Sequence, residues 1–159
     1  MSFSLRTPIA QRLAAAAALS VCLLGLASVQ AQPAAAGTQP LDLRVSVGLV
    51  PGSGATLQYR GTFTGPPLGR GKVSLRSRLG GGGDATVTYV MATSRGTVSG
   101  SASVTLTYSG TTVTYHGTAS ITEGTGAYRE VRARGLRISG RTGLSAEHAT
   151  LRLTGQITS

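Results

Sequence analysis

From Leu41 onward, apolar and polar residues alternate one by one almost to the end of the chain. In residues 41–49, every odd position is Leu or Val, and Asp42, Arg44 and Ser46 stand between them. Strict alternation is the signature of a strand with one buried face and one wet face. The abundant Val and Thr residues favour strands as well. This pattern predicts an all-β domain.

Eight such runs follow one another, separated by short segments rich in Gly, Pro and Ser: 41–49, 56–63, 72–79, 85–91, 97–108, 112–121, 129–139 and 148–157. Connections this short cannot carry parallel crossovers, so sequence neighbours are expected to pair antiparallel, with a hairpin at Ser109–Gly110. In 129–139 the apolar positions change parity at Gly135, which predicts a β-bulge.

Eight sequential strands need closure or protected edges. The expected fold is a single antiparallel, eight-stranded up-and-down β-barrel, whose interior fits its own side chains or one small ligand. A two-sheet sandwich is the alternative, but it needs a long crossover that these connections do not supply. An outer-membrane barrel also has a leader and alternating strands, but the chain lacks aromatic girdles.

Residues 1–31 have the three parts of a cleavable secretory signal. Arg6 and Arg12 are basic, residues 13–26 are apolar, and Val29 and Ala31 fit a cleavage site after Ala31. The apolar stretch is shorter than the roughly 20 residues that span a bilayer, which argues against a retained anchor and predicts a mature protein with no transmembrane segment. Lipidation at Cys22 is disfavoured because Val21 precedes it. The protein is therefore expected to be secreted or periplasmic.

After the signal, residues 32–40 are rich in Ala and Pro, and we expect a disordered linker before a barrel domain at 41–159. Cys22 is the only cysteine in the chain. Cleavage at Ala31 removes it, which leaves no disulfide, thiol nucleophile or thiolate metal site.

The net charge is +10, with 15 Lys and Arg against 5 Asp and Glu. One interpretation is attraction to anionic polymers, and the other is a solvated basic surface. An exported protein rarely meets chromosomal DNA, so no nucleic-acid partner is expected. The densest charge is an arginine cluster, which suits either an anion-binding patch or a protected edge strand; its members are Arg129, Arg132, Arg134, Arg137 and Arg141.

Catalytic or metal-binding signals are weak. His116 and His148 fall on polar positions of their strands, where side chains face water. Glu123 and Glu130 flank a glycine turn, and pairing with the nearby arginines explains them more simply than acid–base catalysis does. The sequence predicts no cofactor, no metal site and no assignable catalytic residue.

One segment resembles a known family. The stretch ITEGTGAY at 121–128, with Gly135 beyond it, is similar to the I-x-G-G-T/S-G-x-F/Y stretch of allene oxide cyclases and dirigent proteins. Those proteins are eight-stranded antiparallel barrels, so the resemblance implies the same fold. Glu123 replaces the first glycine of the pattern. Gly124 and Gly126 are expected to adopt positive φ in a tight turn, and Tyr128 to turn toward the core.

Three functional hypotheses remain. The first is a secreted, non-enzymatic barrel that binds a small apolar ligand or has a structural role. The second is a cyclase or isomerase like those of the resembling families, and the third is cationic adhesion to anionic polymers. The candidate ligand-binding residues for the first two are Tyr59, Tyr89, Tyr115, Tyr128, Glu130 and Arg132. The sequence does not indicate an oligomeric state.

Overall fold

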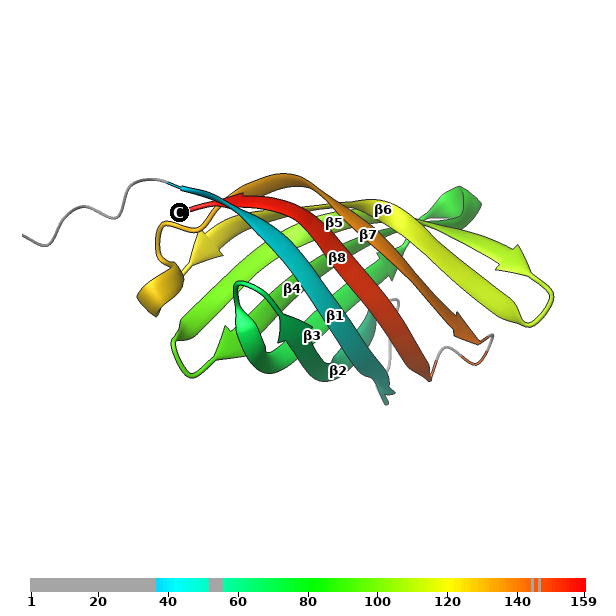
Figure 1. The fold of residues 1–159 in the computed structure, drawn as a ribbon. Coiled ribbons are helices and arrows are strands. Elements are labelled where there is room, and N and C mark those ends of the chain that lie inside the picture. The colour runs from blue at the N-terminus through cyan, green and yellow to red at the C-terminus, as the bar shows by residue number, and fades with distance from the viewer. Residues whose placement is uncertain (1–36, 52–55, 144, 146) are drawn as a thin grey trace, which may run out of the picture. The chain divides into compact units, whose positions relative to one another are not determined.

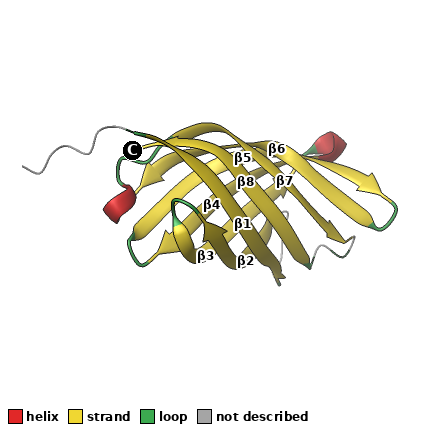
Figure 2. Ribbon diagram, viewed as in Figure 1, coloured by secondary structure: helices red, strands yellow, loops and turns green. Residues whose placement is uncertain are grey.

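The computed structural model describes residues 37–51, 56–143, 145 and 147–159. The predicted signal segment, its cleavage site at Ala31 and linker residues 32–36 lie outside the described residues. Two very short 3-10 turns, η1 (Gly81–Gly83) and η2 (Gly126–Tyr128), lie at opposite ends of the barrel (Figure 2). No helix within the described residues is long and apolar enough to cross a membrane.

Eight strands close into one antiparallel barrel in sequence order, with β8 returning to β1 (Figure 1). This confirms the predicted fold and excludes the sandwich. The hairpin between β5 and β6 has Gly110 at φ 55°, as Ser109–Gly110 predicted. The strands are β1 (Thr38–Val50), β2 (Thr56–Gly65), β3 (Gly69–Leu79), β4 (Asp84–Thr93), β5 (Gly96–Ser109), β6 (Thr112–Gly124), β7 (Ala133–Gly143) and β8 (His148–Thr158).

The alternation sorts side chains as predicted. In β1, Leu41, Leu43 and Val45 are buried, whereas Arg44 and Ser46 are exposed. The outward rows of β5 consist of Ser and Thr, and those of β3 carry Lys, Ser and Arg. In these strands the polar rows face outward and the apolar rows point inward.

The seam between β1 and β8 closes the barrel, and its register runs from the pair Thr38–Thr158 to the pair Gly48–His148. β1 thus begins three residues before the predicted domain start at Leu41. On the outer face of the seam, Arg152 donates two hydrogen bonds to the Asp42 carboxylate, at 2.8 Å and 2.6 Å. These bonds hold the pKa of Asp42 below its usual value.

β7 contains the predicted bulge. Ala119 of β6 pairs with Leu136, but Ile121, two residues on, pairs with Ala133, so β7 carries one extra residue. Gly135 lies within this bulge at φ 65°. The strand begins at Ala133 rather than at residue 129, because residues 129–132 form part of the loop that covers this end of the barrel.

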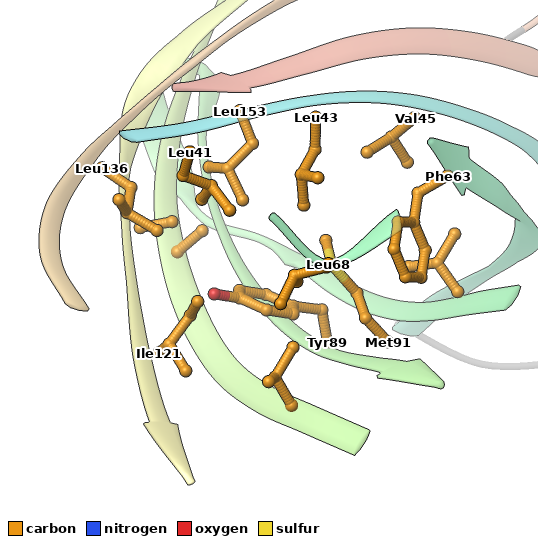
Figure 3. Packing of buried hydrophobic residues seen from close by; sticks show 14 of the residues in the cluster. Leu41, Leu43, Val45, Phe63, Leu68, Tyr89, Met91, Ile121, Leu136 and Leu153 are labelled. Carbon is orange, nitrogen blue, oxygen red and sulfur yellow. The ribbon is translucent and has the colours of Figure 1, made fainter. Parts of the chain in front are cut away.

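The interior is packed in one half only. We call the end formed by the β2–β3, β4–β5 and β6–β7 connections the plugged end, because Leu68, Tyr128 and Val131 from these loops are buried across it. Leucines of β1, β7 and β8 face Leu68, Tyr89 and Met91 across this half (Figure 3). The largest fully buried side chains all lie in this half: Phe63, Leu41, Leu43, Leu136 and Val98.

Tyr128 fixes the plug. Its hydroxyl donates a hydrogen bond to the Leu68 carbonyl at 3.1 Å and lies 3.3 Å from the Thr93 hydroxyl. The Arg95 guanidinium stacks over its ring, 5.4 Å from the ring centre. The plug thereby joins three separate connections of the barrel.

Candidate functional site

A cavity of about 200 Å³ occupies the other half of the barrel, above the packed core. Every strand contributes lining residues, and these come almost entirely from the inward apolar rows. They include Val47, Leu57, Tyr59, Leu75, Ser77, Leu79, Ala85, Val87, Tyr89, Met91, Ala102, Val104, Leu106, Tyr108, Val113, Tyr115, Ile138, Ala149 and Leu151. The same alternation that packs one half of the barrel therefore leaves an apolar chamber in the other.

The cavity meets solvent at the end opposite the plug, which we call the mouth. Leu79 and Tyr108 line the cavity and are 53% and 61% exposed, so the lining continues into the surface there. Leu49 is also exposed, and it pairs across the β1–β2 ladder with the lining residue Tyr59. Three large apolar side chains thus form a rim around the mouth.

Tyr89 and Met91 form the floor, since both belong to the packed core and line the cavity. The Tyr89 hydroxyl donates a 2.9 Å hydrogen bond to the Ser120 carbonyl of β6. To reach it, the side chain crosses β5 at Gly100, where a Cβ would collide with the Ser120 carbonyl and approach the Tyr89 hydroxyl. Because residue 100 is glycine, the Tyr89 side chain of β4 can pass β5 and bond to β6.

Two more tyrosines face the chamber. Tyr59 and Tyr115 are half-buried, and burial raises the pKa of each phenol. The Tyr59 phenol on the same lining raises the pKa of Tyr115 further. With the buried hydroxyl residue Ser77, they are among the few polar residues of a mostly apolar lining.

The structure divides the six predicted ligand-binding residues between the two ends. Tyr59, Tyr89 and Tyr115 line the cavity. Tyr128 belongs to the plug, while Glu130 and Arg132 are exposed on the loop beside it. Arg132 donates hydrogen bonds of 2.8 Å to the carbonyls of Arg129 and Val131, which direct its guanidinium onto its own loop. The cavity is therefore built without these last three residues.

Several lining residues were absent from the predicted set, notably Tyr108, Ser77 and the aliphatic side chains Leu57, Leu75 and Leu151. Their alternation marked them as inward. Alternation does not show how far along the barrel axis a residue lies. That position decides whether an inward side chain lines the cavity or packs in the core.

The carboxylate and histidine side chains lie away from the cavity. All five carboxylates of the chain are outside the cavity lining, as are His116 and His148. Glu123 is hydrogen-bonded to Ser99 at 3.4 Å rather than ion-paired, and the ion pair seen between described residues joins Arg152 and Asp42. Among the described residues, neither Glu123 nor Glu130 forms the ion pair with a nearby arginine that the sequence suggested, so this prediction is wrong. The residues that the structure describes form no cluster of metal ligands.

A second hollow lies on the outer wall, over β5, β6 and the start of β7. Its base carries small hydroxyl side chains, including Ser101, Ser103 and Thr118, and Arg132 and Arg134 border it. Of the predicted arginine cluster, Arg141 lies elsewhere, near the mouth end of β7.

The segment that resembles the barrel families forms the end of β6 and the η2 turn that follows it. Gly126 has φ 58°, as expected, and Tyr128 turns into the core. The expectation of positive φ at Gly124 is wrong; a side chain is excluded there because its Cβ would collide with the Tyr128 carbonyl.

A scan against models of protein families found no match, nor did searches of curated proteins and of solved structures. The resemblance at residues 121–128 stays a prediction. The candidate site is argued from its own geometry.

Proposed function

We propose that this protein is a non-enzymatic, extracytoplasmic carrier that holds a small apolar ligand in the mouth-end cavity of its barrel. The observation that carries this proposal is the apolar chamber that opens to solvent between Leu79 and Tyr108. Concave, mostly apolar sites with a few polar groups are the usual form of small-molecule pockets.

The dimensions limit the ligand. An apolar cavity of about 150 Å³ stays dry and admits benzene. The chamber here, at about 200 Å³, suits a substituted monocyclic ring or a short chain, with any longer part emerging at the mouth. Tyr59, Tyr115 and Ser77 each offer a hydroxyl to an oxygen-bearing group of such a ligand.

Binding is favoured over catalysis by the chemistry of the lining. A cyclase or isomerase needs a group that exchanges protons near neutral pH. Within the described chain, the titratable residues of the lining are four tyrosines and Arg152, whose guanidinium is paired with Asp42. Burial raises the pKa of Tyr59, Tyr89 and Tyr115. These phenols therefore act as neutral hydrogen-bond partners.

The first test is identification of the bound molecule by native mass spectrometry of protein purified from its host. A companion assay uses the uncharged dye N-phenyl-1-naphthylamine, whose fluorescence rises in an apolar site. Ala102 points into the cavity, so Ala102→Leu fills it and is expected to weaken dye binding at least about tenfold, an energy of ~1.4 kcal/mol.

Ser103→Leu is the matched control, because it adds an apolar side chain to the next residue on the exposed face. It should bind dye like the wild type. Equal dye binding by wild type and Ala102→Leu, with nothing bound to the native protein, would overturn the carrier proposal.

The outer hollow supports a second candidate function, adhesion to anionic polymers. Arg132 and Arg134 border a groove of hydroxyl side chains, and Arg137 is exposed on β7, the strand that contains Arg134. Guanidinium and hydroxyl groups together suit sulfate or phosphate esters. Glu123, near the end of β6, and Glu130, in the loop before β7, reduce the local positive charge.

Retention on heparin tests adhesion. We expect salt-dependent retention that falls in the triple variant Arg132→Gln, Arg134→Gln and Arg137→Gln. A matched triple variant at Arg44, Arg60 and Arg70, which are exposed on other strands, should retain the wild-type elution. Equal loss in both variants, or retention that ignores salt, would reject this candidate.

A further inference from the structure

We propose that the mouth docks onto an anionic lipid bilayer, so that the apolar ligand passes between membrane and cavity without crossing water. This inference rests on the proposed carrier function. It adds the partner surface and the route of entry.

The first support is the position of the exposed apolar side chains. Four large hydrophobic residues of the described chain are exposed, and three of them, Leu49, Leu79 and Tyr108, form the rim. They come from β1, β3 and β5, which end at the mouth, and all continue the inward rows of their strands. The fourth, Val90, is on the outer wall at 44% exposure. Exposed apolar groups gathered at one end mark an interaction surface.

The second support is charge beside the rim. Arg78 immediately precedes Leu79, and Arg76 lies two residues earlier; both are exposed and face outward. Arg141 lies two residues before the end of β7, at the same end of the barrel. We call Arg76, Arg78 and Arg141 the collar. Asp84 and Glu147 also lie at this end, and Asp84 accepts a 2.9 Å hydrogen bond from Thr105.

An apolar rim within a basic collar is complementary to a bilayer with anionic headgroups. Apolar side chains enter the boundary between headgroups and acyl chains, while arginines remain at headgroup level. Each arginine close to an anionic surface strengthens binding about fivefold. The cavity then opens directly onto the acyl chains, where apolar ligands reside.

Flotation with lipid vesicles tests the docking. Protein purified from its host is mixed with vesicles of phosphatidylcholine alone or with added phosphatidylglycerol. We expect binding to the anionic vesicles that weakens with salt. The rim variant Leu79→Ser with Tyr108→Ser, and the collar variant Arg76→Gln with Arg78→Gln, should each lower partition by roughly tenfold or more.

Matched controls distinguish binding through the mouth from nonspecific binding of exposed apolar or basic side chains to vesicles. Val90→Ser removes an exposed apolar side chain from the wall, and Arg44→Gln with Arg70→Gln removes two exposed arginines that lie away from the mouth. Both should float like the wild type, with unchanged thermal unfolding in all variants. Equal losses in mouth and control variants, or equal binding to neutral and anionic vesicles, would overturn the docking proposal.

The Ala102→Leu variant distinguishes docking from carriage. It should lose dye binding while it still floats with anionic vesicles. A protein that binds dye but never floats retains its carrier function and refutes docking, whereas one that floats but binds no apolar molecule refutes the carrier proposal on which ligand transfer depends.

Discussion

Tyr89 is the residue at which the packed and hollow halves of the barrel meet. Its ring forms the cavity floor, and its hydroxyl bonds the Ser120 carbonyl across β5. Tyr89→Phe leaves that carbonyl without this partner, and we expect the free energy of unfolding in urea to fall by about 1 kcal/mol. Tyr108→Phe alters an exposed hydroxyl and should leave stability unchanged. Similar losses in the two variants would contradict the bridging role of Tyr89.

The cavity tyrosines also predict a response to alkali. Burial raises the pKa of Tyr59, Tyr89 and Tyr115 above the ordinary value of 10.0. The folded state therefore favours neutral phenols, and this contribution to stability is fully present below the unfolded pKa. It is lost as pH rises from that value through the folded pKa values.

We accordingly expect stability to decline above a pH of about 10. In a titration followed by phenolate absorbance, some tyrosines should ionise at higher pH in the folded protein than in the protein unfolded in urea. Triple replacement of these tyrosines by Phe should flatten the alkaline decline. A decline of unchanged size in that variant would assign the effect to other groups.

At the scale of single elements, the β7 bulge depends on one backbone conformation. Gly135 has φ 65°, and a Cβ there would meet open space, so Gly135→Ala tests conformation without a clash. We expect a loss of roughly 1–2 kcal/mol in unfolding free energy, the ordinary cost of a left-handed residue with a side chain.

Gly143 of the same strand is the matched control. A Cβ there also meets open space, but φ is not in the left-handed region. Gly143→Ala should change stability by less than about 0.5 kcal/mol. Equal effects of the two substitutions in urea denaturation would show that φ at the bulge is not what requires glycine.

The strands were predictable because one face of each is buried and the other wet, which leaves a direct record in the sequence. Thr38, Gln39 and Pro40 escaped prediction because all three are exposed although they pair with β8. The apolar residue Val131 suggested that β7 starts earlier than it does. Val131 is buried, but it belongs to the plug and not to a strand.

The site was predictable only in part. Alternation identified Tyr59, Tyr89 and Tyr115 as inward. It could not show that these three line the cavity while Tyr128 lies in the plug, because height along the axis depends on the stagger of all eight strands at closure. Glu130 and Arg132 were chosen for their chemistry, and the loop that carries them lies beside the plug, away from the cavity.

For the molecule as a whole, uneven filling predicts uneven protection of backbone amides. Leu41 and Leu43 of β1 pack in the full half, whereas Leu49 of the same strand is exposed at the mouth. Local opening costs least where few apolar contacts are broken. Hydrogen exchange should therefore be slower at Leu43 than at Leu49, and a ligand should slow the mouth amides most. Uniform exchange along β1 would contradict this division.

The separation of a filled half from an empty one has a consequence for how such a protein can change over time. The side chains that keep the barrel closed, such as Leu43 and Leu136, are distinct from lining residues such as Leu57 and Leu151. Substitution of the lining residues changes which ligands fit the cavity, while the core residues still stabilise the fold. Descendants of this chain can therefore acquire different ligands with little loss of folding stability. A library randomised at the lining residues should contain many soluble variants with new ligand selectivities.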